Sequence, residues 1–427
     1  MPQVRGFLDR MVGSIAQAAH GMVLTRGERR ADRLAKWLRT LISERGEASG
    51  ATLARRCVAL YQGLDEAGRR RLFDRLAREF SPDGEAVLAA AQAYHRDPSP
   101  AQLATLLRVT EPPRQEVFRR MNMAPGGTGA IVEMRRLILG GLKEHPQWAT
   151  LDNDLTHLLG SWFNRGVLEL RRIDWRTPAA ILEKLIAYEA VHEIHGFPDL
   201  KRRLERDRRC FAFFHPALPD EPLIFVEVAF VDELPAAVEP ILALDSAVAD
   251  PRRARCAVFY SITNCQPGLR GVSFGNFLIK QVAEDLHREL PNLKIFATLS
   301  PIPGLRRWLE RALGPRLATI AGSREALEAL AARYLTRAWE DGQVLDPVAR
   351  FHLGNGARLE RVNSGADGSP KGREQSFGMM VNYVYELGSV ESNHEDYVNR
   401  HHAACSAAVD RLARQAEALL SPPAAPS

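Results

Sequence analysis

The stretch Arg270-Gly271-Val272-Ser273-Phe274-Gly275-Asn276 runs directly into a helix-like segment at residues 277–286. A β-branched run at residues 256–263 precedes it, and a strand-like run at residues 294–300 follows the helix-like segment. Glycines at the start of a helix let the backbone approach a ligand, and the free N–H groups and helix dipole there favour phosphate. An ordinary turn uses the same glycines, so the loop alone is weak evidence. Together with its flanks, the loop predicts an α/β unit that can bind a phosphorylated ligand.

The composition of the chain is ordinary for a globular protein of two or three domains. Hydrophobic residues make up 45% of the 427 residues and charged residues 26%. The net charge of +5 is small for this length. It suits a protein that binds a phosphorylated small molecule and does not require nucleic acid as a partner.

The cysteines and the N-terminus bear on the compartment. The five cysteines show no C-x-x-C spacing, which argues against a structural zinc site and for a reducing compartment. No run of about 18 apolar residues is present, so no membrane span is expected. Arg5, Asp9 and Arg10 interrupt the apolar residues that a signal peptide would need. We therefore expect a cytoplasmic protein.

Residues 1–172 are predicted to form an all-helical N-terminal domain. Apolar residues recur at helical spacing, for example at Leu34, Trp37, Leu38 and Leu41. Proline and glycine interrupt the pattern near residues 81–84, 97–100 and 124–127. Such a domain more often supports assembly than carries chemistry.

Beyond residue 172 the pattern alternates between strands and helices, which predicts an α/β domain over residues 173–420. The sequence therefore belongs to the α+β class, and residues 421–427 look like a disordered tail. Strands are expected at 210–214, 223–230 and 379–385, and helices at 179–190 and 324–341.

Three charged or histidine-containing groups have plain structural explanations. The basic cluster at residues 201–209 could hold nucleic acid, but no exposed aromatic residues are interleaved with it, and a solvated helix face is favoured. His192-Glu193-Ile194-His195 lacks the further ligands of a metal site, and the side chains of His401 and His402 diverge on a helix. We expect no metal site and no nucleic-acid partner.

Ser300 and His352 are the polar residues with the most chemical interest. Ser300 ends the second strand-like run, before the stiff turn Pro301-Ile302-Pro303-Gly304. Ligands of α/β sheets gather at strand C-termini, although a serine there could equally cap the turn. His352 lies between Phe351 and Leu353 in what reads as an apolar strand, where a histidine is usually a hydrogen-bonded core residue. Nothing in the spacing pairs the two.

At these residues the chain resembles the malonyl-CoA decarboxylase family. The matching blocks are Gly160–Leu170, Glu189–His192, Asp199–Arg203, Phe259–Ile262, Gly268–Val272, Gly275, Phe277–Lys280, Leu299–Gly304, Phe351–Leu353, Asn355–Ala357, Asn382–Tyr383 and Tyr385. The resemblance implies a helical domain used in oligomer assembly, as a dimer or tetramer, and a catalytic domain like that of the GNAT acetyltransferases.

The resemblance also implies the site residues. The loop from Arg270 to Asn276 would hold the CoA pyrophosphate through its backbone, although relatives can carry glutamate at the position of Ser273. Ser300 and His352 would be the catalytic pair, with Tyr385 orienting His352.

The implied reaction converts malonyl-CoA to acetyl-CoA and CO₂ without a metal or organic cofactor, in malonate or fatty acid metabolism. Loss of CO₂ leaves an enolate, which needs hydrogen-bond donors and then a proton on carbon. His352 would donate that proton, and Ser300 would bind the malonyl group and act as proton acceptor if it is coupled to His352.

Two other functions use the same fold. A CoA-dependent acyltransferase would need an acceptor-amine site with its own base, and a non-catalytic malonyl-CoA sensor would leave the two catalytic positions free to vary. The intact Ser300 block and His352 favour the decarboxylase.

Overall fold

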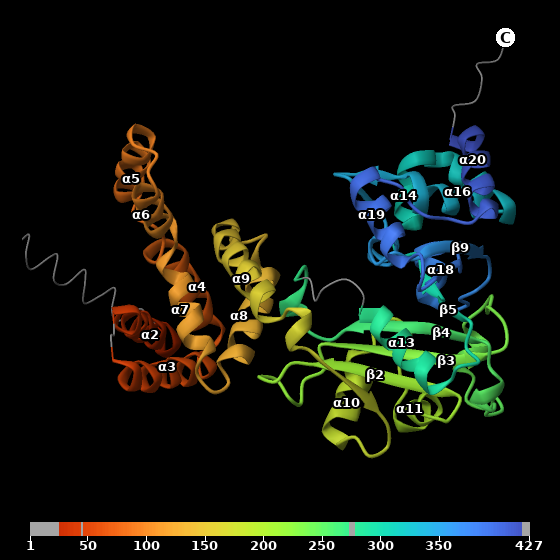
Figure 1. Ribbon diagram of the computed structural model, residues 1–427, viewed down its shortest axis with the longest axis horizontal. Coiled ribbons are helices and arrows are strands. Elements are labelled where there is room, and N and C mark those ends of the chain that lie inside the picture. The colour runs from red at the N-terminus through yellow and green to blue at the C-terminus, as the bar shows by residue number, and fades with distance from the viewer. Residues whose placement is uncertain (1–24, 44–45, 273–277, 421–427) are drawn as a thin grey trace, which may run out of the picture. The chain divides into compact units, whose positions relative to one another are not determined.

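The computed structural model describes residues 25–43, 46–272 and 278–420, which fall into two compact units (Figure 1). The helical unit comprises the described residues up to Asn164 together with residues 266–272. The sheet unit comprises residues 165–265 and 278–420. The predicted tail at 421–427 and the loop residues Ser273, Phe274, Gly275 and Asn276 lie outside the described residues.

The helical unit confirms the helical character expected of the N-terminal part. Amphipathic spacing drives it: the first described helix buries Ala31, Leu34, Leu38 and Leu41 on one face. Its helices are α2 (Arg26–Ser43), α3 (Glu47–Gln62), α4 (Glu66–Glu79), α5 (Gly84–Arg96), α6 (Pro100–Thr110), α7 (Pro113–Asn122), α8 (Gly127–Gly141) and α9 (Ala149–Trp162), with short 3₁₀ turns at Pro146–Trp148 and Pro267–Leu269.

The sheet begins before residue 173. Strand β1 (Glu169–Ile173) pairs antiparallel with β2 (Arg208–Phe214) along its whole length, so residue 172 lies inside a strand. Three of its five residues are charged and only Ile173 is buried. A polar edge strand of this kind has too weak a hydrophobic pattern to be recognised from sequence.

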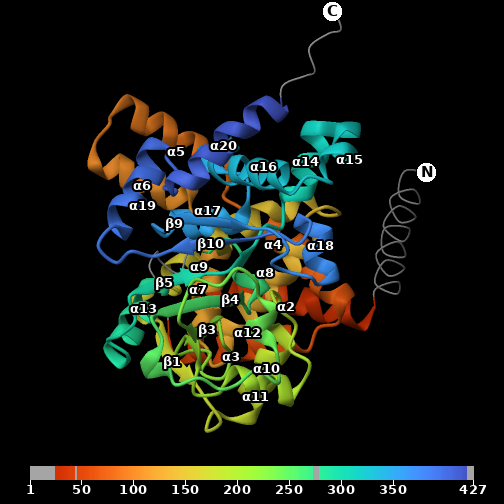
Figure 2. The same cartoon turned by 90° about the vertical axis from the view of Figure 1, so that its right-hand side faces the viewer.

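The sheet is mixed, in the order β1-β2-β3-β4-β5-β10-β6 with β9 also paired to β10, and Figure 2 shows β9 and β10 beyond β5. Its other strands are β3 (Ile224–Val231), β4 (Cys256–Asn264), β5 (Ile295–Thr298), β6 (Ser300–Pro301), β9 (Arg358–Asn363) and β10 (Met380–Val384). Strands β4 and β5 are parallel and are joined through α13 (Leu278–Glu289). The predicted order of strand, helix and strand is confirmed.

Helices pack against the sheet and make up much of the rest of this unit. Helices α10 (Ala179–Tyr188) and α11 (Phe197–Arg203) pack Leu182, Leu185 and Leu200 against buried residues of β2 and β3. The remaining elements are α12 (Glu239–Leu242), α14 (Leu305–Leu313), α15 (Leu317–Ile320), α16 (Arg324–Arg337), α17 (Pro347–Gly354), α18 (Pro370–Ser376), α19 (Val390–Arg400), α20 (Ala407–Leu420), the 3₁₀ turns Arg165–Val167, Pro251–Arg253 and Gly314–Arg316, and the hairpin of β7 (Trp339–Glu340) and β8 (Gln343–Val344).

The basic cluster at residues 201–209 is largely internal, which corrects the expectation of a solvated helix face. Arg202 pairs with Asp207 at 2.8 Å, and Arg203 pairs with Asp199 and Glu227, each at 2.9 Å. Arg208 and Arg209 are also buried and paired, whereas Lys201 and Arg206 are exposed. Guanidinium groups suit such buried pairs because they stay charged and form several hydrogen bonds at once.

Candidate active site

The site lies where two parallel strands separate. Pairing between β4 and β5 ends at Phe259 and Thr298, and the N–H of Leu299 makes a last bond to the carbonyl of Phe259 at 3.1 Å. Strand β4 continues along β3, whereas Ser300 pairs with Val381 of β10. Ser300 is therefore at the strand C-terminus where the sheet opens, and it is 5% exposed.

Three of the predicted site residues meet at this opening. Ser300 Oγ lies 3.0 Å from His352 Nε2, and His352 Nδ1 lies 2.8 Å from Tyr385 Oη. They come from β6, from α17 and from the residue that follows β10. Both ring nitrogens of His352 are thus held, one by each neighbour.

His352 lies on a helix, and the expectation of an apolar strand was wrong. Asp346 caps α17 by accepting from the N–H groups of Val348 and Ala349, each at 3.0 Å, and Pro347 occupies the first turn. The helix ends at Gly354. An Asp-Pro start and a glycine stop are helix signals, and eight residues are too few for a clear helical period.

Asp346 also ties this helix to the turn after Ser300. Its second carboxylate oxygen accepts from the N–H of Gly304 at 3.3 Å, and it receives a further hydrogen bond from Tyr334. A side chain at Gly304 would lie 2.1 Å from Tyr334 Oη, so this close approach requires glycine. Asp346 is fully buried, and burial raises its pKa although the surrounding N–H groups lower it.

Further polar residues support Ser300 that the sequence did not single out. Ser300 Oγ donates to Thr298 Oγ1 at 2.9 Å, and the N–H of Tyr383 also reaches Thr298 Oγ1, at 3.3 Å. Asn382 Nδ2 donates to the carbonyl of Thr298 at 2.9 Å. The ring of Tyr383 stacks on His352, with centroids 4.6 Å apart. The sequence signal for these residues is the block Asn382–Tyr385, because three of its four residues contact Thr298 or His352.

Burial keeps the site uncharged. It lowers the pKa of His352 to about 3, so the imidazole is neutral near pH 7. It raises the pKa of Tyr385 well above the usual value, so the phenol keeps its hydrogen and can donate to Nδ1. With Ser300 donating to Thr298, Nε2 then carries the ring hydrogen and points it at Ser300 Oγ.

The described part of the predicted CoA loop belongs to the helical unit. Gly271 has φ 77°, a conformation that favours glycine, and no atom lies where its Cβ would be. Arg270 and Gly271 are exposed, and Val272 is buried. The loop is anchored one turn earlier, because the carbonyl of Gly268 accepts from Arg135 Nη1 at 2.8 Å. Ser300, His352 and Tyr385 belong to the sheet unit.

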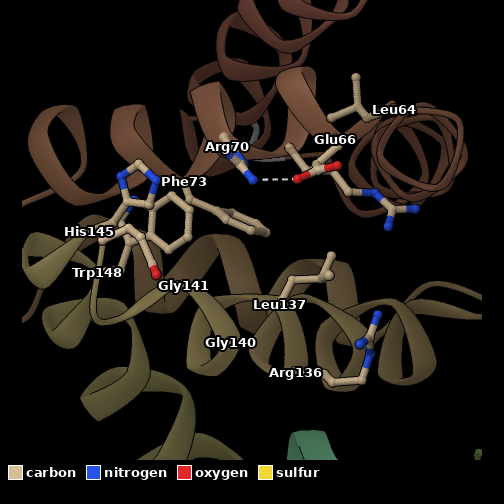
Figure 3. Close-up of a pocket in the computed structure, with 12 residues that line it drawn as sticks. Leu64, Glu66, Arg70, Phe73, Arg136, Leu137, Gly140, Gly141, His145 and Trp148 are labelled. Atoms are coloured by element: carbon tan, nitrogen blue, oxygen red, sulfur yellow. Dashed lines mark hydrogen bonds and ion pairs between the residues drawn. The ribbon is translucent and has the colours of Figure 1, made fainter.

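A cavity of about 660 Å³ lies in the helical unit (Figure 3). Its wall includes Phe73 and Trp148, with His145 stacked on Trp148 at 4.0 Å. Arg70 at its rim is paired with Glu66. None of the predicted site residues lines this cavity.

Two general features concern ions and membranes. In the described ranges, no group of three or more His, Cys, Asp or Glu side chains is arranged to hold a metal ion. No helix in that same part of the chain is both long and apolar enough to cross a membrane.

Comparison with protein-family models matches nearly the whole described chain after α4. The malonyl-CoA decarboxylase N-terminal domain matches residues 80–163. The malonyl-CoA decarboxylase C-terminal domain matches residues 166–323 and 316–421, which include Ser300, His352 and Tyr385.

Individual relatives agree. The mitochondrial malonyl-CoA decarboxylase of Anser anser anser is 34% identical over 409 residues, covering 82% of this chain and 81% of its own, and that of Rattus norvegicus is 32% identical over 398 residues, covering 80% and 81%. The crystal structure of malonyl-CoA decarboxylase from Rhodopseudomonas palustris superposes with a TM-score of 0.84 at 48% identity, covering 89% of this chain and 99% of that one. The enzyme from Agrobacterium vitis gives 0.83 at 45% identity, with the same coverage. The chain therefore belongs to the malonyl-CoA decarboxylase family of carboxy-lyases.

Proposed function

We propose that this chain converts malonyl-CoA to acetyl-CoA and CO₂ at the group formed by Ser300, His352 and Tyr385. The observation that carries the proposal is the chain of hydrogen bonds from Tyr385 through His352 to Ser300, placed where β4 and β5 separate. Family membership supports the choice of substrate.

The reaction breaks the bond between the carboxylate carbon and the methylene carbon of the malonyl group. The electron pair passes into the thioester as an enolate, and the methylene carbon then takes up one proton, which comes ultimately from solvent. We assign the hydrogen bond to the malonyl group to the hydroxyl of Ser300 and the donation of the proton to His352, which lies 3.0 Å from that hydroxyl.

The neutral state of His352 fits this role. A malonyl carboxylate beside the ring brings a negative charge that favours the imidazolium, opposing the effect of burial. Binding of the substrate thus raises the pKa of His352 and supplies the proton donor only when substrate is present. Tyr385, which keeps its hydrogen, holds the ring through Nδ1.

The loop from Arg270 to Asn276 is proposed to bind the CoA phosphates through its backbone. The positive φ of Gly271 and the open space around it support a close approach by a ligand.

The five cysteines are free thiols, four of them buried, which suits a cytoplasmic enzyme.

The helical unit is proposed to assemble copies of the chain into a dimer or tetramer. Figure 1 shows α5 and α6 as a hairpin that projects from the other helices of this unit. Helix α6 buries none of its residues, and Leu88, Leu103 and Leu107 are exposed. Exposed leucines on two neighbouring helices favour a protein contact surface.

The direct test is acetyl-CoA formation from malonyl-CoA by purified protein in the presence of EDTA. We expect turnover by the wild type and a loss of about 100-fold or more in Ser300→Ala and in His352→Ala, the contribution of a positioned acid–base group. Ser392→Ala, an exposed serine on α19, serves as the control and keeps full rate. CoA binding without turnover by the wild type would instead favour a sensor or an acyltransferase. Full activity in both site variants would show that other residues catalyse the reaction.

A further inference from the structure

His192 has a buried ring nitrogen without a hydrogen-bond partner in the part of the chain that the structure describes. The residue is 8% exposed, and among the described residues no group forms a hydrogen bond with its Nε2. Buried polar atoms in folded proteins are nearly always satisfied, so such an atom indicates a missing partner. The proposed reaction assigns no role to His192.

The segment that carries His192 is fixed to the open part of β4. The Glu189 carboxylate accepts from the N–H groups of Val191 at 2.7 Å and His192 at 2.9 Å. It also accepts from the hydroxyls of Ser261, at 2.8 Å, and Thr263, at 3.3 Å. Both hydroxyl residues follow Phe259, the last residue of β4 that pairs with β5. The segment therefore lies beside the stretch of β4 that β5 has left.

A second anchor holds the same segment from α18. Lys371 Nζ donates to the carbonyl of Ala190, and the carboxylate of Asp367 and the ammonium of Lys371 act on the His192 ring with opposite signs. Arg203, which is paired with Asp199 and Glu227, is the other charged group that acts on the ring. The ring is thus held between β4 and the residues around α18.

The protonation of the two ring nitrogens determines whether the missing partner is a hydrogen-bond donor or an acceptor. The backbone carbonyl of Tyr260 hydrogen-bonds the ring, and a carbonyl can only accept. Because Nε2 has no partner, the nitrogen that donates to Tyr260 is Nδ1. Burial lowers the pKa of His192 to about 4, so the ring is neutral and Nε2 presents a lone pair. The partner that Nε2 lacks is consequently a donor.

We propose that His192 Nε2 accepts a hydrogen bond from an amide N–H in the arm of the bound CoA thioester. The inference rests on the proposed function, because a thioester that reaches Ser300 brings its arm to the opening between β4 and β5. That arm carries two amide N–H groups, whereas the malonyl carboxylate and the thioester oxygen only accept. His192 therefore contributes to recognition of the carrier and not of the acyl group.

An interaction with the carrier contributes equally to the ground state and the transition state. Its loss raises KM and leaves kcat nearly unchanged. A role limited to packing would not depend on which thioester is used. The amide content of the substrate is therefore the variable that separates the two roles.

The test compares His192→Phe with the wild type on three malonyl thioesters. Malonyl-CoA carries two amides, malonyl-N-acetylcysteamine carries one, and the malonyl thioester of butanethiol carries none. We expect kcat/KM to fall about tenfold for malonyl-CoA, through KM, and to be unchanged for the butanethiol ester. A loss with N-acetylcysteamine as well assigns the contact to the amide nearer sulfur. A loss with malonyl-CoA alone assigns it to the farther amide.

His192→Gln, which keeps an acceptor, is expected to recover most of the loss. His195→Phe, an exposed histidine on the same segment, is the matched control and behaves as wild type. An equal loss for all three esters would overturn the inference while leaving the decarboxylase proposal intact. A wild type inactive on all three overturns the proposed function instead. Calorimetry of acetyl-CoA binding then decides the inference, since equal affinity of wild type and His192→Phe would also overturn it.

Discussion

His352 shows at the scale of one residue how burial sets chemistry. Its pKa is lowered to about 3 by burial, from an ordinary value of about 6.5. The free enzyme therefore holds a neutral imidazole at every pH above about 4, and protonation becomes significant only below that.

The pH dependence of kcat/KM follows from this. Because kcat/KM reports groups of the free enzyme and the proposed proton donor is the imidazolium, we expect kcat/KM to rise as the pH falls from 8 to 5, with no limb near pH 6.5 from His352. Steady-state rates between pH 5 and 8 provide the measurement, with ¹⁵N spectra of labelled histidine as an independent reading of the ring. An imidazolium signal for His352 at pH 6 in the free enzyme would contradict this assignment.

Tyr385 acts through the same ring. Its hydroxyl lies 2.8 Å from Nδ1, whereas the stacking of Tyr383 on the ring does not involve that hydroxyl. Tyr385→Phe should therefore lower kcat about tenfold, the effect of one lost hydrogen bond, and leave KM nearly unchanged. Tyr397→Phe is a fitting control, because its hydroxyl accepts from the N–H of Val344 away from His352. A rise in KM with constant kcat would show that Tyr385 binds substrate instead.

The sequence identified some of these residues and could not identify others. The sequence pattern points to Ser300 and His352 separately, but their pairing and the role of Tyr385 come from the family resemblance, because spacing alone does not bring together residues 52 and 33 positions apart. Thr298 and Asp346 look in sequence like an ordinary strand threonine and a helix cap. Their roles follow from which backbone groups lie opposite them, and that is a property of the folded chain.

At the scale of elements, α17 and the turn after β6 must keep one relative position for Ser300 to meet His352. Asp346 is the direct link, since one carboxylate caps the helix and also accepts from Gly304. Helix α19 holds the other end of α17, where His394 Nδ1 lies 2.7 Å from the carbonyl of Gly354. The pair of Ser300 and His352 is thus positioned by α17, which is held at both ends, and by the turn that Asp346 links to it.

Asp346→Asn tests this link. Asparagine caps helices as well as aspartate does. Its amide has only one acceptor oxygen, so it can accept either from the N–H groups at the start of α17 or from the N–H of Gly304, but not from both. We expect kcat to fall about tenfold with a folded protein and unchanged affinity for acetyl-CoA. Ser323→Ala removes the N-terminal cap of α16, at the opposite end of that helix from Tyr334, and should change stability without changing kcat. Equal kinetic effects in the two variants would mean that Asp346 matters only as a cap.

The elements themselves were predicted unevenly for physical reasons. The central strands β3 and β4 were clear because both faces are buried and the runs are apolar. The run at 294–300 was expected as one strand, but it divides into β5 and β6 as the chain changes partner from β4 to β10. No local pattern records such a change of partner.

At the scale of the whole molecule, many of the arginines that contribute to the net charge of +5 lie inside the protein. The buried and paired ones are Arg114, Arg135, Arg202, Arg203, Arg208 and Arg209. Helices α5 and α6 show the reverse, because apolar residues there lie on the surface. Helices α5 and α6 carry helical apolar spacing, but in a single copy α6 buries no residue.

We therefore expect the α5–α6 hairpin to hold copies of the chain together in an oligomer. Leu103 and Leu107 lie one turn apart on α6, and replacing both with glutamate places two charges on the surface that we expect to pack against a second copy. The pair of substitutions should reduce the mass measured by light scattering after size exclusion, while circular dichroism shows retained helix. Leu244→Glu with Val398→Glu, two equally exposed apolar residues of the sheet unit, is the matched control and should leave the mass unchanged. If the oligomer persists in the α6 variant, or if the wild type is a monomer, the hairpin does not mediate assembly.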